Sequence, residues 1–570
     1  MTTLMPIRIA ALACAIVGFA AAAPTALRAQ RFDVHETSIT DMQRALQQKR
    51  VTSRELVRQS LERIGMYEDQ LHAAITVNPR ALAIADSLDR LRAAGHILGP
   101  LHGIPVALKD NIQTTAMRTT GGALAFRDLV PPYDATLTKN LEAAGAIIIA
   151  KTQLTELANW MTTGMPGNYN SLNGYGFNPW DARRDPRDAF FDGRPVLGTG
   201  GSSSGAGTNV SFWAANVGTE TSGSILSPSN QNMLVGIKPT VGRVSRYGVI
   251  PVTSDQDTPG PMARSVRDAA IMLGALEGAH PDPHDTATTK CPPPAGRDYT
   301  KFLDLGALKG ARIGIPRTFF YEPTPSGSNL PRGGLSPDQR TVMNAVIATL
   351  KSKGAVIVDP TEIPSVVAPD PATNFLLWNV CSGLEEGKGK NSGCSIAFMY
   401  GMKRDFNAWL ATLGDRAPVK SLTELREWNT AHANAGTIKY GQAQLDASDQ
   451  MDLDANRARY EADRRKDHLL SATNGLDAAL QTNHLDALLF PGVTSANIAA
   501  RTGYPSVTVP YALLPVVATG ANAFPPGFTP KPAPFNVTFT GTACSEPKLI
   551  ALAYAFEQAT KKRIAPPDFP

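Results

Sequence analysis

Helical and strand patterns alternate along the chain, and this order limits the folds that the chain can adopt. In one unit, Asp134 could cap a helix whose apolar face carries Leu137 and Leu141. Gly145 then ends that helix, and the wholly apolar run 146–149 follows as a short strand. A unit of this kind predicts a helix that packs back onto a buried sheet.

The same order occurs again in the second half of the chain. A strand is expected at 311–315, a helix begins at Ser336, and a strand follows at 355–358. Near the start, Thr52-x-x-Glu55 has the form of a capping box ahead of a further helix. Together these patterns predict an α/β fold in which helices cover a largely parallel or mixed sheet.

Composition excludes several classes of protein. The chain has 570 residues, of which 43% are apolar and 18% charged, so it is neither disordered nor collagenous. Its net charge, 55 − 50 = +5, is too small to predict nucleic-acid binding. None of the five cysteines forms a C-x-x-C pair, and zincin and P-loop motifs are absent from the sequence.

The amino terminus has the form of a secretory signal peptide. Arg8 precedes the apolar run 9–23, which is short for a membrane span, and small residues follow. We expect cleavage after Ala29, leaving a mature chain 30–570 in the periplasm or outside the cell, without stable membrane association. A retained membrane anchor and lipidation at Cys14 are the alternatives. Export permits disulfides, and the cysteines nearest in sequence, apart by 394 − 381 = 13 positions, are Cys381 and Cys394.

Three further segments interrupt the regular pattern. The proline-rich stretches 281–296 and 515–537 indicate surface loops rather than domain linkers. Between about 360 and 470 the sequence becomes polar and helical, and we expect an insertion there that shapes a substrate pocket.

The segment 198–226 is rich in glycine and serine and is the strongest candidate for a functional site. Such residues form tight loops whose backbone N–H groups can face a ligand. A flexible linker is the alternative, but apolar residues from Val210 to Val217 indicate a buried segment between two loops. Gly201-x-Ser203-x-Gly205 also matches a nucleophile elbow, although no strongly apolar strand directly precedes it. The histidines that such an elbow would need have no supporting context; they are His432, His468 and His484.

Three motifs taken together resemble the amidase signature family, whose members are serine hydrolases with a Ser–cis-Ser–Lys triad. They are G-I-P-V-A-L-K-D-N at 103–111, G-G-S-S-S-G at 200–205 and G-T-E-T-S-G-S-I at 218–225. Further matches lie at 236–245, 257–264, 539–541, 557–560 and 563. The resemblance covers about 40–280 and 485–568. It implies the α/β amidase signature fold, a mixed, twisted sheet covered by helices on both faces, in a single large amidase domain with a variable pocket region at about 281–484.

The resemblance implies a role for each matching residue. Lys109 matches the catalytic lysine, Ser202 the serine that follows a cis peptide bond, and Ser224 the nucleophile. The backbone N–H groups of Thr221, Ser222 and Gly223 match the oxyanion hole. Lysine acts as a base only when neutral, so burial must lower its pKa from about 10.4. No metal or other cofactor is required for this chemistry.

The function implied is an exported amide hydrolase. The triple serine and the Thr-Glu-Thr-x-Gly-Ser loop resemble the bacterial peptide amidase branch, which implies peptide-amide or aryl amide substrates. We expect the protein to be a monomer or a homodimer. An amidotransferase A-type subunit that releases ammonia for a partner and a serine esterase are the alternatives. Aromatic residues of 161–197 and 375–410 could wall an apolar pocket or could pack the loops. They are Tyr169, Tyr175, Phe177, Trp180, Phe190, Phe191, Phe375, Trp378, Phe398 and Tyr400.

Overall fold

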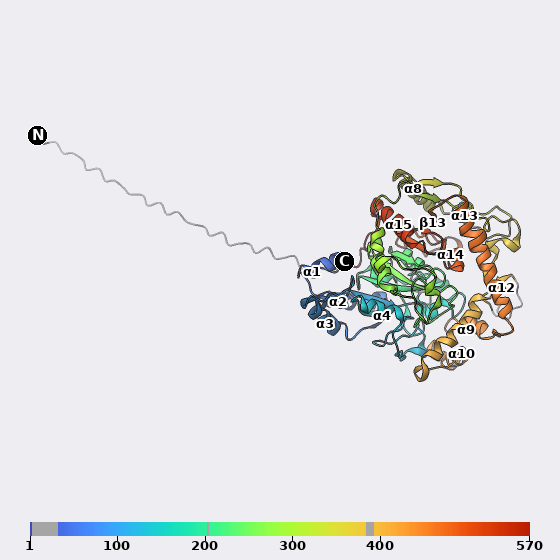
Figure 1. The fold of residues 1–570 in the computed structure, drawn as a ribbon, viewed down its shortest axis with the longest axis horizontal. Coiled ribbons are helices and arrows are strands. Elements are labelled where there is room, and N and C mark those ends of the chain that lie inside the picture. The colour runs from blue at the N-terminus through green and yellow to red at the C-terminus, as the bar shows by residue number, and fades with distance from the viewer. Residues whose placement is uncertain (3–31, 202–204, 384–392) are drawn as a thin grey trace.

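Eleven strands form one mixed sheet in the computed structural model, which describes residues 1–2, 32–201, 205–383 and 393–570 (Figure 1). In spatial order the strands are β1 (Ala74–Val77), β3 (Ile147–Thr152), β2 (Pro105–Lys109), β6 (Ala215–Glu220), β8 (Thr258–Ala263), β7 (Val235–Lys238), β14 (Ser506–Leu514), β15 (Ala533–Thr540), β13 (Ala487–Pro491), β9 (Arg312–Gly314) and β10 (Val356–Val358). The strands expected at 146–149, 311–315 and 355–358 are thus confirmed as β3, β9 and β10.

Strand directions within the sheet are mixed, which is one of the two arrangements that the alternating pattern allows and the one that the family resemblance implies. β2 runs parallel to both of its neighbours, β3 and β6. β8 is antiparallel to β6 and β7, and β15 is antiparallel to β14 and β13. Two small two-stranded sheets lie outside the main one, formed by β4 (Tyr169–Asn170) with β5 (Gly174–Tyr175) and by β11 (Asn379–Val380) with β12 (Cys394–Ser395).

Helices cover both faces of this sheet. Along β2, Val106 and Leu108 belong to one hydrophobic cluster and Ala107 to the other, because successive side chains of a strand point to opposite faces. The helices are α1 (Ile39–Gln47), α2 (Ser53–Leu71), α3 (Ala81–Ala93), α4 (Thr136–Ala143), α5 (Ala206–Asn209), α6 (Leu226–Gln231), α7 (Val266–Leu276), α8 (Pro337–Ser352), α9 (Ala397–Thr412), α10 (Leu422–Ala431), α11 (Ala443–Asp449), α12 (Arg457–His468), α13 (Asp477–Thr482), α14 (Ala496–Thr502) and α15 (Glu546–Thr560).

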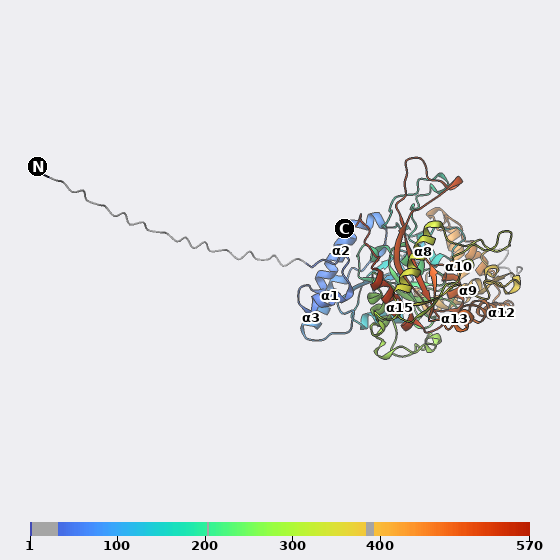
Figure 2. The same cartoon turned by 90° about the horizontal axis from the view of Figure 1, so that it is seen from above.

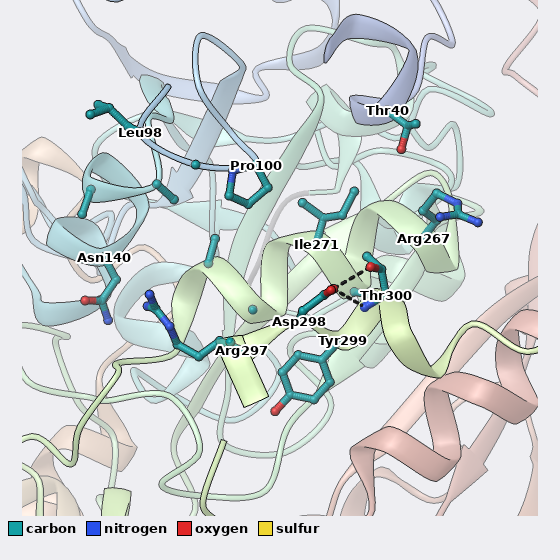
Figure 3. Close-up of a pocket in the computed structure, with 17 residues that line it drawn as sticks. Thr40, Leu98, Pro100, Asn140, Arg267, Ile271, Arg297, Asp298, Tyr299 and Thr300 are labelled. Atoms are coloured by element: carbon teal, nitrogen blue, oxygen red, sulfur yellow. Dashed lines mark hydrogen bonds between the residues drawn. The ribbon is translucent and has the colours of Figure 1, made fainter. Parts of the chain in front are cut away.

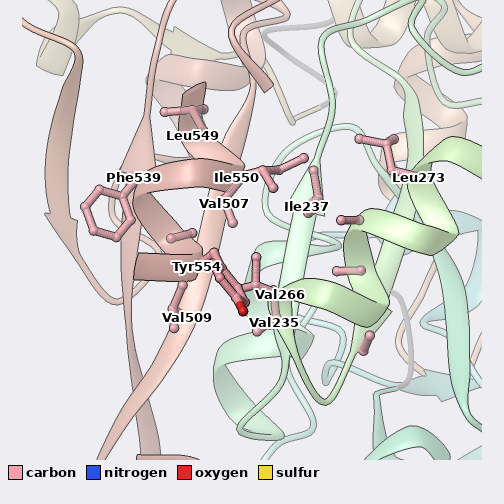
Figure 4. Packing of buried hydrophobic residues seen from close by; sticks show 14 of the residues in the cluster. Val235, Ile237, Val266, Leu273, Val507, Val509, Phe539, Leu549, Ile550 and Tyr554 are labelled. Atoms are coloured by element: carbon pink, nitrogen blue, oxygen red, sulfur yellow. The ribbon is translucent and has the colours of Figure 1, made fainter. Parts of the chain in front are cut away.

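The core on one face lies between two helices and the middle of the sheet (Figure 4). Ile550 of α15 and Leu273 of α7 are fully buried and belong to the same cluster as Ile237 of β7 and Val507 of β14. Burying side chains of this size contributes about 1.5–3 kcal/mol each. This packing holds β7 and β14 in the same sheet as β2 and β6, the strands whose ends carry the candidate site.

Two of the three expected helix caps are confirmed. The Thr52 hydroxyl accepts a hydrogen bond from the N–H of Glu55, and Ser336 forms a full capping box with Gln339. The prediction for Asp134 is wrong: the N-cap of α4 is Ala135, which makes no side-chain cap. The Asp134 carboxylate instead accepts hydrogen bonds from the N–H and hydroxyl of Thr115.

The segment 360–470 is helical, as expected, and contributes α9 to α12. In both views the yellow-to-orange helices α9, α10 and α12 lie away from α1 to α3 (Figures 1 and 2). The loop predicted over 515–537 is correct only in part, because residues 533–537 belong to β15. Among the residues that the structure describes, none of the helices combines the length and apolar character that a membrane crossing requires.

Two disulfides join segments around the sheet. Cys381 and Cys394, which the sequence leaves as an open pairing, are bonded to each other. Cys291 bonds Cys544, 253 residues away, and so ties the proline-rich loop 281–296 to the turn before α15. Sequence spacing gives no sign of this second pair.

Candidate active site

Lys109 is the last residue of β2 and its side chain is fully buried. The Nζ atom donates hydrogen bonds to the hydroxyl of Thr219, at 2.8 Å, and to the carbonyl of the same residue, at 3.2 Å. Thr219 lies on β6, the parallel neighbour of β2, and its hydroxyl also accepts a hydrogen bond from Asn111 at 3.0 Å. The lysine is therefore held at the carboxyl end of two adjacent parallel strands.

The environment of Lys109 favours its neutral form. Burial lowers the pKa of Lys109 to about 7, and the negative charges of Asp257 and Glu220 oppose this shift. A lysine with such a pKa is largely deprotonated in mildly alkaline solution. It can then accept a proton, which an ordinary surface lysine cannot do at that pH.

Ser224 lies on the turn that joins β6 to α6. β6 ends at Glu220, and Gly223 adopts a positive φ of 82°, a conformation that favours glycine. The Glu220 carboxylate accepts hydrogen bonds from the N–H groups of Ile225 and Leu226, at 2.8 and 3.0 Å. This carboxylate satisfies N–H groups at the start of α6 and fixes the turn immediately around Ser224.

The three residues before Ser224 form a loop with available backbone donors. Within the described ranges, no hydrogen bond joins the N–H of Thr221, Ser222 or Gly223 to another group. The Gly223 carbonyl, by contrast, accepts a hydrogen bond from the N–H of Ser227 at 2.7 Å. The loop thus offers backbone N–H donors of the kind that an oxyanion hole requires to bind a substrate oxygen.

The glycine-rich segment meets this loop at Gly201. A methyl group placed on Gly201 would come within 3.0 Å of the Ser224 Cα, so the two backbones are in direct contact. The Gly201 carbonyl accepts a hydrogen bond from the Thr155 hydroxyl at 3.1 Å. Ser202, the cis bond expected before it, and Ser203 of the alternative elbow lie outside the described residues, but Gly201 places the start of that segment beside Ser224.

Comparisons with known proteins agree with this arrangement. A family model described as "Amidase" matches residues 55–550. The chain belongs to the amidase family. A protein of Arabidopsis thaliana named "Probable amidase" is 32% identical over 94% of this chain and 92% of its own. The crystal structure of the native peptide amidase of Stenotrophomonas maltophilia is similar with a TM-score of 0.76 and 34% identity, over 93% of this chain and 98% of that one.

A second kind of relative matches only part of this amidase. The A-type subunit of the glutamyl-tRNA(Gln) amidotransferase of Geobacter sp. is 38% identical, but over 57% of this chain and 60% of its own. The amidases match along nearly the whole length, and the expected fold, a mixed sheet covered by helices in one large domain, is confirmed by these neighbours. The protein is an enzyme that hydrolyses amides.

Several residues around the site of this amidase are not singled out by the sequence. Asn111 and Thr219 bind each other beside Lys109, and Asp257 accepts a hydrogen bond from the Thr221 hydroxyl at 2.5 Å. All three lie within the motifs that resemble the amidase signature, which could have marked them as candidates. The sequence does not indicate which residues they contact. Asp110, next to Lys109, forms an ion pair with buried Lys151 at 3.0 Å, which indicates a structural role.

The aromatic residues of 161–197 and 375–410 are mostly buried, and several contact other aromatic rings. Tyr169 lies against Tyr175, and Tyr400 stacks on Tyr460 with ring centroids 4.2 Å apart. Eight of the ten are buried, and Phe191, 82% exposed, is the clearest exception. These contacts favour the loop-packing alternative for the eight buried residues.

A cavity of about 550 Å³ lies elsewhere in the molecule (Figure 3). It is bounded by Ile271 of α7, Asn140 of α4, the loop around Pro100, and the segment in which Asp298 accepts hydrogen bonds from Thr300. Neither Lys109 nor Ser224 lines it. This cavity is therefore separate from the candidate active site.

Proposed function

We propose that the protein is an exported amidase that cleaves a carboxamide C–N bond through an acyl-enzyme on Ser224. The observation that carries the proposal is Lys109, fully buried with its pKa lowered to about 7, on the strand that neighbours the one leading to Ser224. Ser202 relays the proton between them in this proposal, which follows from the family resemblance and from the position of Gly201.

In the first half-reaction, the Ser224 hydroxyl attacks the carbonyl carbon of the amide. Its proton passes to Ser202, whose own proton passes to neutral Lys109, because a hydroxyl can both donate and accept. The carbonyl electron pair moves to oxygen, and the N–H groups of Thr221, Ser222 and Gly223 stabilise the resulting oxyanion. Collapse of the tetrahedral species breaks the C–N bond, and the proton passes from Lys109 through Ser202 to the nitrogen of the leaving amine.

In the second half-reaction, water takes the place of the amine. Lys109 removes a proton from water through Ser202, and the hydroxide adds to the acyl carbon. Collapse of this second tetrahedral species releases the carboxylic acid and returns the proton to Ser224. Neutral Lys109 is required at the start of each half.

Substrate class is proposed from the comparisons. The peptide amidase of Stenotrophomonas maltophilia matches along nearly its whole length, and a similar peptide amidase structure is a complex with the competitive inhibitor chymostatin. We therefore propose C-terminally amidated peptides, or aryl amides of similar size, as substrates. Esterase activity is a side reaction that the same acyl-enzyme would permit.

Two disulfides support the export of the enzyme. Disulfides form and persist in oxidising compartments and are rare in the cytosol. Cys291–Cys544 and Cys381–Cys394 use all four cysteines that would remain after removal of 1–29. The amino-terminal pattern and this pairing point to the same location by independent routes.

The direct test is labelling and mutation of Ser224. We expect an active-site serine reagent to label Ser224 in intact protein, and Ser224→Ala to abolish release of ammonia from a peptide amide. A label on Ser203 instead would support the nucleophile elbow. Turnover by the purified single chain also distinguishes an amidase from the amidotransferase alternative, which would need its partner.

A further inference from the structure

Thr221 is the first residue of the proposed oxyanion loop, and two side chains fix it. Its hydroxyl donates to Oδ1 of Asp257 at 2.5 Å, and its carbonyl accepts a hydrogen bond from the Gln256 side chain at 3.2 Å. Both Thr221 and Gln256 are buried, so water cannot easily replace these partners. The loop is therefore anchored by residues that lie about 36 positions further along the chain.

Asp257 is itself held in a single orientation. Its second carboxylate oxygen, Oδ2, accepts hydrogen bonds from the N–H groups of Val252 at 2.9 Å and Thr253 at 3.0 Å. Three donors thus converge on one buried carboxylate, a set that an ionised aspartate satisfies as an acceptor. Burial raises the pKa of Asp257 to about 6, which leaves it mostly ionised at neutral pH.

The segment around Asp257 is clamped in turn by α9 and α12. Asp405 of α9 accepts a hydrogen bond from the N–H of Ser254 at 2.7 Å, and Tyr460 of α12 donates to Asp255 at 2.8 Å. Gly401 of α9 packs directly onto Thr253, where a methyl group would come within 2.2 Å of the threonine hydroxyl. The segment 252–257 thus connects the insertion helices to the oxyanion loop.

We infer that the Asp257 carboxylate, through its hydrogen bond with the Thr221 hydroxyl, positions the backbone N–H groups that bind the oxyanion. Asp257 and the Thr221 side chain are positioning residues rather than catalytic ones, since neither needs to touch the substrate. Oxyanion donors act only at about 2.7–3.1 Å from the developing charge, so a small displacement of the loop weakens them. The inference rests on the proposed function of this loop.

The test compares two threonines that donate to an aspartate. Thr221→Val removes the hydroxyl while keeping the shape of the side chain, and we expect kcat to fall about 10- to 100-fold with KM changed less than about threefold. Thr136→Val is the matched control, because the Thr136 hydroxyl, at the start of α4, donates to Asp282 at 2.6 Å. Neither of these residues belongs to the proposed oxyanion loop. We expect the kcat of Thr136→Val to equal that of the parent. Thr221→Ser, which keeps the hydroxyl, should recover most of the lost kcat.

A transition-state analogue gives an independent readout. The Ser224 oxygen adds to the carbonyl carbon of a peptide aldehyde, so that an O–C bond forms while the C=O π bond opens onto its oxygen, which occupies the oxyanion hole. The serine proton passes through Ser202 to neutral Lys109, as in the proposed first half-reaction. We expect Thr221→Val to weaken aldehyde binding by the same factor as kcat, whereas a merely structural defect would lower the melting temperature and raise KM. If Thr221→Val kept the kcat and the aldehyde affinity of the parent enzyme while Ser224→Ala was inactive, the inference about Asp257 would be overturned but the proposed function would stand. An active Ser224→Ala would overturn the proposed function itself.

Discussion

Gly201 contacts Ser224 backbone to backbone, with space for no side chain between them. A methyl group on Gly201 would lie 3.0 Å from the Ser224 Cα and 2.9 Å from Pro228 Cδ. Gly201 also adopts a positive φ of 45°. The glycine therefore allows the segment that carries Ser202 to approach the proposed nucleophile.

We expect Gly201→Ala to lower kcat/KM by at least about tenfold, because the backbones must separate and a displacement of about 1 Å is costly in catalysis. Gly327→Ala controls for the cost of placing an alanine at a positive φ. Gly327 also has a positive φ, of 82°, but a methyl group there would meet nothing within 4 Å. The control should lose about 1 kcal/mol of stability and retain its activity. Equal activity in the two variants would show that the contact is not needed.

The pH dependence of catalysis should report Lys109. Burial lowers its pKa to about 7, and only the neutral form is a base, so kcat/KM should rise with pH through about 7 and then level off. We expect Lys109→Ala to lose about 10²- to 10⁴-fold in kcat. Lys109→Arg should do no better, because guanidinium stays protonated.

Lys238 is the appropriate control for this assignment. It is a second fully buried lysine, on β7, and burial lowers its pKa to about 8. Lys238→Met should leave the rise near pH 7 in place. If that rise persisted in Lys109→Ala or vanished in Lys238→Met, Lys109 would not be the titrating base.

The pH dependence of kcat/KM should also change when the charge of Asp257 is removed. Its negative charge raises the pKa of Lys109, as does that of Glu220, so Asp257→Asn should move the acid limb to lower pH. Arg246 and Asp405 also face Asp257 and remain in the variant. Asp282→Asn, a carboxylate that likewise accepts hydroxyl donors, should leave the limb where it is. A limb that stayed fixed in Asp257→Asn would argue against the charge coupling.

The sequence indicates the proposed reacting groups more readily than the residues that support them. Lys109 and Ser224 lie in sequence motifs that resemble those of the amidase signature family, so the sequence alone singles them out. The bond from Thr221 to Asp257 and the disulfide from Cys291 to Cys544 join positions 36 and 253 residues apart, and only the folded sheet brings them together. Local patterns carry no information about such contacts.

The predictions that proved wrong, for Asp134 and for residues 533–537, also failed because contacts between distant parts of the chain decide the structure there. Asp134 is a good N-cap residue by type, but Thr115 offers it two donors in the folded chain, and tertiary contacts prevail over local preference. Residues 533–537 include a proline and look like a loop, yet they pair with β14. The helices and strands of the regular α/β units were predictable because their apolar periodicity reflects burial directly.

Export predicts a specific thiol count. The full chain has five cysteines, and cleavage after Ala29 would remove Cys14, leaving four that form two disulfides. Protein recovered from the periplasm or medium should begin near Gln30 and contain no thiol that reacts under denaturing conditions without a reductant. A variant lacking 2–29 should stay in the cytoplasm, where its cysteines are reduced. A soluble cytoplasmic protein with an intact amino terminus would contradict export.

Substrate preference provides the sharpest test of the proposed class. If the pocket takes a peptide-like or aryl acyl group, each additional buried methylene contributes about 0.8 kcal/mol, so two of them raise kcat/KM by more than about tenfold. We therefore expect an N-acylated dipeptide amide or an aryl amide to exceed acetamide, glutamine and asparagine by at least about tenfold in kcat/KM. All should be measured on one preparation, with Ser224→Ala as the background. Equal or better hydrolysis of the small amides would reject the large-substrate proposal. It would leave the amidase chemistry intact, since the proposed mechanism depends on Lys109 and Ser224 rather than on the pocket.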